Sequence, residues 1–195
     1  MNYDYRQLVL KELDIILFKK NGNIFIDFVG NCIEWFQWGI KCKSPEFVHV
    51  AVVTRVPTGL ILFETNPPKA KYTRIEKIDM SKCVVLSRTI SLPEGELQKA
   101  RDWCKSKKNL TYGYGSILKF IWLGFKGRLG PRFRNESHEE LRKHTPVFNE
   151  VCSQLVDDLF YKSLKLDILP DIGEGNALPG DIADSKCHKI INSPS

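Results

Sequence analysis

Two apolar segments separated by a short turn constrain the fold of this 195-residue chain more than any other feature. Residues 47–54 are rich in valine, residues 60–65 are mostly leucine, isoleucine and phenylalanine, and Pro-Thr-Gly at 57–59 lies between them. Beta-branched and aromatic residues favour strands, whereas proline and glycine together favour a turn. We therefore expect an antiparallel hairpin that belongs to a small antiparallel sheet.

Strand and helix patterns follow one another along the rest of the chain. Ser91 and Glu94, with Pro93 between them, form the pattern of a capping box that opens a helix. Periodicity and breakers predict further strands at 13–18 and 82–88, helices at 24–39, 91–109 and 115–125, and a helix with Cys152 in its first turn. Together, these strands and helices predict an α+β fold with the small sheet packed against helices. We expect a single domain, 1–195, with a core at about 13–185, a basic loop at 126–137 and a flexible tail at 191–195.

The composition excludes several classes of protein. No apolar stretch approaches the roughly 20 residues of a membrane span, and the acidic start of the chain does not resemble a signal peptide. The six cysteines form no Cys-x-x-Cys pair, so we expect reduced thiols and neither a metal site nor a cofactor. These features predict a cytoplasmic protein, with release or non-classical export left open.

Basic residues gather at 99–108 and again at 126–134, and the net charge is +6. Such a surface suits an anionic polymer or a membrane surface, but it is equally typical of a solvated face. Nucleic acid is not expected as a partner, because no recognisable nucleic-acid-binding module accompanies the charges. His138, His144 and His188 lack apolar neighbours in the sequence and are expected at the surface.

Two polar residues interrupt the predicted hairpin. His49 stands among valines and Glu64 among leucine, isoleucine and phenylalanine, and each is costly to bury without a hydrogen-bond partner. If Val56–Gly59 forms the loop, Arg55 pairs with Leu60 and Ala51 with Glu64. Because side chains alternate along strands, His49 and Glu64 then share a face as diagonal neighbours. A core histidine satisfied by the backbone is the simpler alternative.

Cys152 lies in the first turn of a predicted helix, downstream of Pro146 and the N-cap candidate Asn149. The apolar periodicity of this helix runs through Val151, Leu155, Val156, Leu159 and Phe160. A thiol in the first helical turn lies near the positive end of the helix dipole, which favours the nucleophilic thiolate. A buried structural cysteine is the alternative, since free cysteine is among the most buried residue types.

Together, Cys152, His49 and Glu64 are the three groups that nucleophilic catalysis needs. The thiol is the expected nucleophile, the imidazole its base, and the carboxylate the group that orients the imidazole. Asn66 lies on the same strand face as Glu64 and is the alternative orienting residue. Further supporting candidates are Asp14, Tyr112 and Tyr114, although an edge cap or pairing for Asp14 and core packing for both tyrosines are the simpler explanations.

The same motifs resemble a known family. Asp14-Ile-Ile-Leu-Phe, His49-Val-Ala-Val-Val, Phe-Glu64-Thr and Val-Cys152-Ser-Gln-Leu-Val are similar, in this order, to the circularly permuted NlpC-type papain-like enzymes. Within these, the chain is most like the YiiX/YebB-like branch and resembles lecithin–retinol acyltransferase relatives. The segment around Tyr112 and Tyr114 looks like the aromatic segment before the nucleophile helix. Two departures are a missing Pro-Gly before Asp14 and Ala51 in place of a common glycine.

The resemblance implies a permuted papain-like fold with a Cys152–His49–Glu64 triad and no cofactor. It implies a cysteine hydrolase or acyltransferase, acting through an acyl-enzyme on an amide, ester or thioester of a small-molecule, peptide or lipid substrate. Peptidoglycan peptides and lipids are both compatible with it. The alternative is a catalytically silent papain-like protein that binds an anionic partner through its basic face. The sequence does not determine the oligomeric state.

Overall fold

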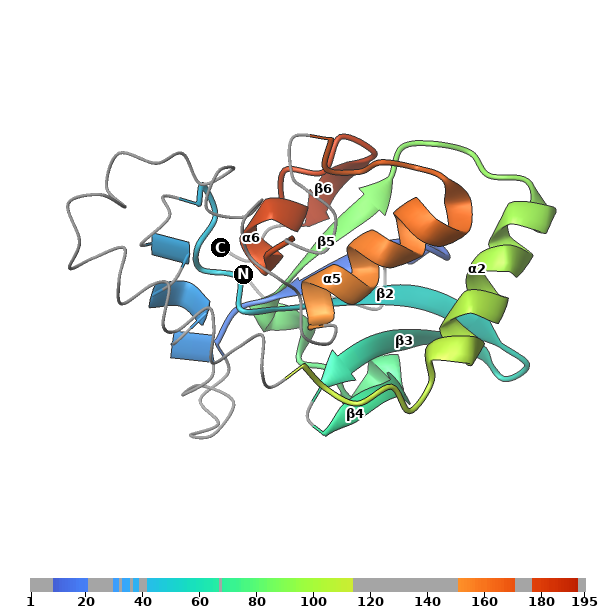
Figure 1. The fold of residues 1–195 in the computed structure, drawn as a ribbon, viewed down its shortest axis with the longest axis horizontal. Helices are drawn as coiled ribbons and strands as arrows, with labels where there is room; N and C mark the ends of the chain where they lie inside the picture. Colours follow the sequence, from blue (N-terminus) through green and yellow to red (C-terminus); the bar gives the residue numbers. More distant parts are fainter. Residues whose placement is uncertain are drawn as a thin grey trace.

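A single antiparallel sheet forms the centre of the molecule (Figure 1). The computed structural model describes residues 9–20, 30–38 except 32 and 36, 42–113 except 67, 151–170 and 177–192. The strands run in the spatial order β4-β3-β2-β1-β5-β6, and each neighbouring pair is antiparallel. The strands are β1 (Ile15–Phe18), β2 (His49–Val56), β3 (Gly59–Asn66), β4 (Lys69–Thr73), β5 (Cys83–Arg88) and β6 (His188–Asn192). The fold is therefore α+β.

Four of these strands, β1, β2, β3 and β5, confirm the strand predictions, whereas β4 and β6 were not predicted. Both are edge strands, and both carry too many polar residues to stand out as apolar segments. Ile191 and Asn192 were expected in a flexible tail, but they belong to β6. Pairing with β5 gives their backbone groups hydrogen-bond partners, which orders them.

The described part of the chain also contains helices and 3₁₀ turns. They are α2 (Glu94–Lys107), α5 (Cys152–Asp158), which continues as the π-helix η4 (Leu159–Ser163), and α6 (Pro179–Ile182), with 3₁₀ turns η2 (Ile75–Lys77) and η3 (Met80–Lys82). Residues 30–38 are also helical where described, in agreement with the predicted helix at 24–39. The predicted helix at 115–125 and the basic loop at 126–137 lie outside the described residues. No helix in the described part of the chain is long and apolar enough to cross a membrane.

The capping box predicted from Ser91 is wrong. Helix α2 begins at Glu94, and its N-cap, Pro93, makes no side-chain capping hydrogen bond. The residue before a proline avoids helical geometry, so the helix does not extend back toward Ser91. Instead, Glu94 and Glu96 place negative charge in the first turn, where the helix dipole favours it.

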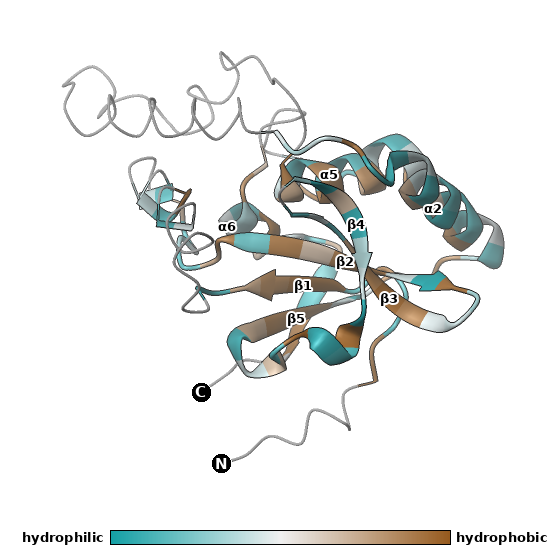
Figure 2. Cartoon of the chain, turned by 90° about the horizontal axis from the view of Figure 1, so that it is seen from below, coloured by the Kyte–Doolittle hydropathy of each residue, from teal (hydrophilic) through white to brown (hydrophobic). Residues whose placement is uncertain are grey.

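The two faces of the sheet bury separate apolar clusters. Helices α2 and α5 cover one face (Figures 1 and 2), where α5 and η4 pack on alternate residues of β1, β2 and β3. The opposite face holds the intervening strand residues, against which the 3₁₀ turns pack. Members of the first cluster include Ile15, Val50, Val52, Phe63, Leu155 and Phe160, and of the second Ile16, Ala51, Val53, Leu62 and Val85. In Figure 2 the central strands are hydrophobic, while the outer surface of α2 is hydrophilic.

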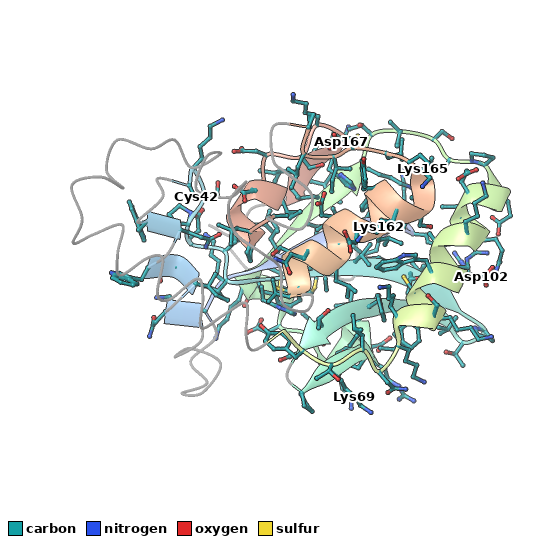
Figure 3. All side chains as sticks on the ribbon, in the orientation of Figure 1. Cys42, Lys69, Asp102, Lys162, Lys165 and Asp167 are labelled. Atoms are coloured by element: carbon teal, nitrogen blue, oxygen red, sulfur yellow. The ribbon has the colours of Figure 1, made fainter. Side chains whose placement is uncertain are left out.

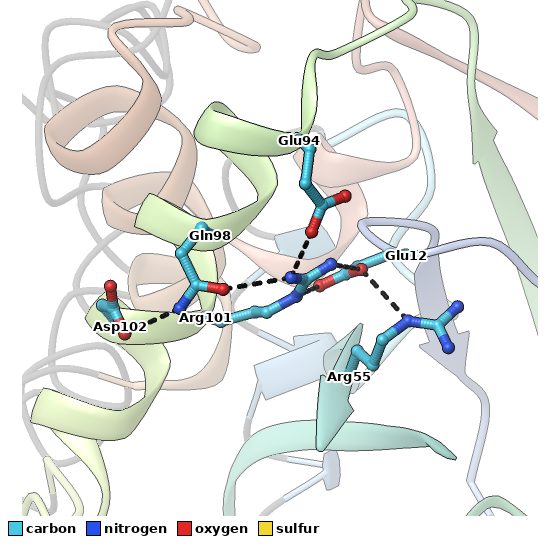
Figure 4. Close-up of polar contacts among 6 residues, drawn as sticks. All are labelled: Glu12, Arg55, Glu94, Gln98, Arg101 and Asp102. Atoms are coloured by element: carbon cyan, nitrogen blue, oxygen red, sulfur yellow. Dashed lines mark hydrogen bonds and ion pairs between the residues drawn. The ribbon is translucent and has the colours of Figure 1, made fainter. Parts of the chain in front are cut away.

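An ion-pair network fastens α2 to the sheet (Figure 4). Glu12 precedes β1, is buried, and accepts two hydrogen bonds of 2.7 Å from the Arg101 guanidinium of α2. Arg101 also donates to Glu94 at 2.5 Å, and Arg55 of β2 lies 3.6 Å from Glu12. The paired hydrogen bonds and the charges raise the pKa of Arg101, so this residue stays cationic.

His188 is not the free surface residue that its sequence context predicts. Its ring packs edge-on against Phe160 at 5.1 Å between centroids, and its two nitrogens contact Ser185 Oγ at 3.0 Å and the Leu13 carbonyl at 3.2 Å. Burial lowers the pKa of His188, which favours the neutral ring. The residue therefore helps to fasten β6 to the core.

Candidate active site

The β2–β3 hairpin positions the first two candidate residues. Arg55 pairs with Leu60, as predicted, and the register extends to Val52 opposite Phe63. Val56 and Gly59 are themselves paired, so only Pro57 and Thr58 form the loop. Gly59 adopts a φ of 128°, which a glycine tolerates best. Since the register is confirmed, strand alternation places His49 and Glu64 on one face of the sheet.

A short hydrogen bond joins His49 to Glu64. The distance from His49 Nε2 to Glu64 Oε2 is 2.7 Å, and the two side chains are 18% and 5% exposed. The His49 ring also packs against Phe18 of the neighbouring strand at 5.1 Å between centroids. The imidazole is thus held from two sides, while its partial exposure leaves a path to solvent.

Strand β4 supplies a second layer of contacts to Glu64. Thr73 Oγ1 donates a hydrogen bond of 2.5 Å to Glu64 Oε1, and Lys71 is paired with Glu64 in the strand register. Burial alone would raise the pKa of Glu64, but the hydrogen bond and charge of His49, the Thr73 hydroxyl and the Lys71 charge together lower it. The carboxylate therefore stays ionised beside the imidazole.

Cys152 is the first residue of α5, and its local sequence determines where this helix begins. Val151 is extended, and its N–H donates to Gln154 Oε1 at 3.1 Å. Ser153 Oγ donates to the Ala177 carbonyl at 2.7 Å, which anchors the first turn to the segment before α6. Val151, rather than the expected Asn149, is the N-cap of α5, and Asn149 itself lies outside the described residues. The result is a buried thiol in the first turn of a helix that packs on β2 and β3.

Cys152 lies close enough to the His49 imidazole to act on its pKa. Because Glu64 occupies Nε2, Nδ1 is the ring nitrogen that remains for the sulfur. Burial would lower the pKa of His49, but the charge and hydrogen bond of Cys152, followed by those of Glu64, raise it to about 10. The raised pKa keeps the His49 imidazole in its charged form beside the Cys152 side chain.

The remaining predicted site residues do not join this group. Asp14 is completely buried and accepts hydrogen bonds from the backbone N–H of Lys11, the Ser87 hydroxyl and the Arg88 N–H, so it caps the start of β1. Asn66 ends β3, and it is Glu64 that hydrogen-bonds His49.

Of the two tyrosines, only one lies in the described part of the chain. Tyr112 is buried, and its N–H donates to the Pro68 carbonyl at the β3–β4 turn. Tyr114 lies outside the described residues.

Thr73 and Lys71 are the neighbours of the site that the sequence pattern did not predict. Both belong to the edge strand β4, whose first residue, Lys69, lies at the outer edge of the sheet (Figure 3). The alternation of lysine with apolar residues in Lys-Ala-Lys-Tyr-Thr is a strand signal, but a weak one. Among the described residues, no group of three histidine, cysteine or acidic side chains is arranged to hold a metal ion.

Comparison with known proteins gives one informative likeness. No family model matches the chain, and no curated protein matches it. Among solved structures, it is similar to the crystal structure of metalloprotein yiiX from Escherichia coli O157:H7 (DUF1105), with a TM-score of 0.59 and 13% identity. The likeness covers 93% of this chain and 96% of the other. At this identity it shows a shared, YiiX-like fold.

Proposed function

We propose that the chain is a cysteine hydrolase or acyltransferase that cleaves an amide, ester or thioester through an acyl-enzyme on Cys152. The observation that carries the proposal is the position of His49, whose ring is hydrogen-bonded to the Glu64 carboxylate and whose pKa is raised by the nearby Cys152 side chain. A nucleophile, a base and a group that orients the base are the parts that such chemistry requires.

In the first half-reaction, the Cys152 thiolate bonds to the substrate carbonyl carbon, and the carbonyl electron pair moves to oxygen. The backbone N–H of Cys152, in the first turn of the helix, is suited to stabilise this oxyanion. Collapse breaks the bond to the leaving group, which takes the proton of His49. Cys152 then carries a thioester, and His49 is neutral.

In the second half-reaction, neutral His49 accepts a proton from water or from another acceptor, which attacks the thioester. The acyl product leaves, and the thiolate–imidazolium pair is restored. Water as acceptor makes the protein a hydrolase, whereas an alcohol or amine makes it an acyltransferase. Throughout both steps, the Glu64 carboxylate keeps the ring oriented and stabilises its charged form.

A permuted papain-like architecture is part of the proposal. The order His49, Glu64, Cys152 along the chain and the helix α5 packed on the sheet support it. The shared fold with yiiX agrees with the YiiX-like resemblance of the sequence motifs. That protein is named a metalloprotein, whereas the site proposed here uses the His49 imidazole as a base between Glu64 and Cys152.

The test is the pH dependence of Cys152 alkylation by iodoacetamide, with the labelled cysteine identified by mass spectrometry. The reagent must be small, because Cys152 is only 2% exposed. We expect rapid labelling at pH 6, well below the ordinary thiol pKa of about 8.5, and loss of this labelling in His49→Ala. Asn66→Ala is the matched control, since Asn66 follows Glu64 on the same strand face and should leave labelling unchanged.

Slow labelling with an ordinary thiol pH dependence, equal in wild type and His49→Ala, would refute the proposal. The catalytically silent binding protein would then be the better interpretation. If the thiol is activated, amide, ester and thioester libraries, including peptidoglycan peptides and lipids, identify the substrate, with Cys152→Ala as the inactive control.

A further inference from the structure

We propose that Thr73 is a positioning residue of the Cys152 site, acting through Glu64. The inference rests on the proposed function, and it extends the group from three residues to four. The hydroxyl of Thr73 binds one carboxylate oxygen of Glu64, and His49 binds the other, at 2.5 and 2.7 Å. Thr73 itself belongs to a strand that contributes none of the three reacting groups.

The register of β3 and β4 explains why Thr73 reaches Glu64. Thr73 is paired with Leu62, and Lys71 with Glu64, so Thr73 is a diagonal neighbour of Glu64 on the same face. The hydroxyl lies at the end of a paired strand, where the backbone is held by the ladder. A β-branched side chain in a strand also has few χ1 rotamers, which keeps the hydroxyl in place.

The hydrogen bond determines how Glu64 presents its second oxygen. A glutamate side chain has three rotatable bonds, and one contact from His49 does not restrict all of them. Once Thr73 holds Oε1, Oε2 is directed at His49 Nε2, which restricts the orientation of the ring. Lys71 contributes positive charge. A point charge alone does not orient the carboxylate as a directed hydrogen bond does.

Neighbouring residues allow a closely matched experiment. Thr73→Val removes the hydroxyl while keeping the shape, and Thr73→Ser keeps the hydroxyl while removing a methyl group. Thr65→Val is the control, because Thr65 follows Glu64 directly and its Oγ1 is buried without a hydrogen-bond partner among the described residues. Replacing that hydroxyl should be neutral or slightly stabilising.

The measurement is the rate of Cys152 alkylation across pH 5–10, together with the His49 imidazole signals in ¹⁵N NMR. We expect Thr73→Val to slow labelling at pH 6 by about 10-fold, the usual weight of one hydrogen bond to a charged group. His49 should titrate at lower pH in this variant, because its carboxylate partner is less well placed. Thr73→Ser should restore most of the rate, and Thr65→Val should match wild type.

The outcomes separate this inference from the function on which it rests. Wild-type rates and wild-type His49 titration in Thr73→Val, with labelling still lost in His49→Ala, would overturn the role of Thr73 alone. Equal losses in Thr73→Val and Thr73→Ser, or in Thr65→Val, would also overturn it, because they indicate a general packing effect. Labelling that is indifferent to His49 would overturn the proposed function. If circular dichroism shows that Thr73→Val does not fold, Thr73→Ala is the second variant without the hydroxyl.

Discussion

Arg101 is hydrogen-bonded to two carboxylates in very different surroundings. This difference predicts how much stability the fold loses when each charge is removed. The side chain of Glu12 is 5% exposed and receives two hydrogen bonds from Arg101, whereas that of Glu94 is 73% exposed and receives one (Figure 4). Glu→Gln removes the charge and keeps the shape at either position. Glu12→Gln and Glu94→Gln are therefore a matched pair.

Glu12→Gln, at the buried position, should lower the free energy of unfolding far more than Glu94→Gln. Removing one partner of a fully buried pair costs about 3–5 kcal/mol, and the 18% exposure of Arg101 reduces this to roughly 2–4 kcal/mol for Glu12→Gln. An exposed pair contributes less than about 1 kcal/mol, which limits the effect of Glu94→Gln. For a chain of this length, the melting temperature should fall by roughly 4–16 °C for Glu12→Gln and by no more than about 4 °C for Glu94→Gln.

Urea unfolding followed by circular dichroism at 222 nm measures both free energies of unfolding. One molar sodium chloride is the internal check, because salt screens the exposed pair and leaves the buried one largely intact. Equal losses in the two variants, or a loss in Glu12→Gln that salt removes, would contradict the argument from burial.

Three further predictions concern single positions. His49 should remain an imidazolium up to about pH 10 in NMR titrations and titrate at lower pH in Cys152→Ala, since Cys152 is the largest cause that raises its pKa. Because the folded-state pKa of His49 exceeds the unfolded value of about 6.5, the contribution of His49 to stability should be complete below pH 6.5 and disappear toward pH 10. An unchanged His49 pKa in Cys152→Ala would contradict the role of Cys152. Gly180→Ala should destabilise by about 2 kcal/mol or more, since the new Cβ would lie 2.4 Å from a backbone oxygen, whereas Gly95→Ala in α2, with open space around it, should stabilise slightly. Finally, Cys83 should react with iodoacetamide only under denaturing conditions, because burial raises its pKa to about 12, and native-state labelling at neutral pH would show that reasoning to be wrong.

The local sequence pattern was sufficient to predict the β2–β3 hairpin and its register. The turn at Pro57 and the two-residue period of a strand leave few ways to pair these segments, so the sequence predicted that Arg55 lies opposite Leu60 and that His49 and Glu64 share a face. A helix with Cys152 in its first turn was likewise predicted from its apolar periodicity. Where local rules competed, the prediction failed, as in the capping box at Ser91 that Pro93 prevents.

Tertiary structure alone decided which of these residues meet. Nothing in the sequence states that the first turn of α5 lies against the start of β2, because their contact depends on how a whole helix packs on a sheet. The same holds for Thr73, whose strand is half polar and is defined only by pairing with β3. Periodicity acts over a few residues and determines faces and registers, whereas the burial of apolar surface acts over the whole chain and brings distant faces together.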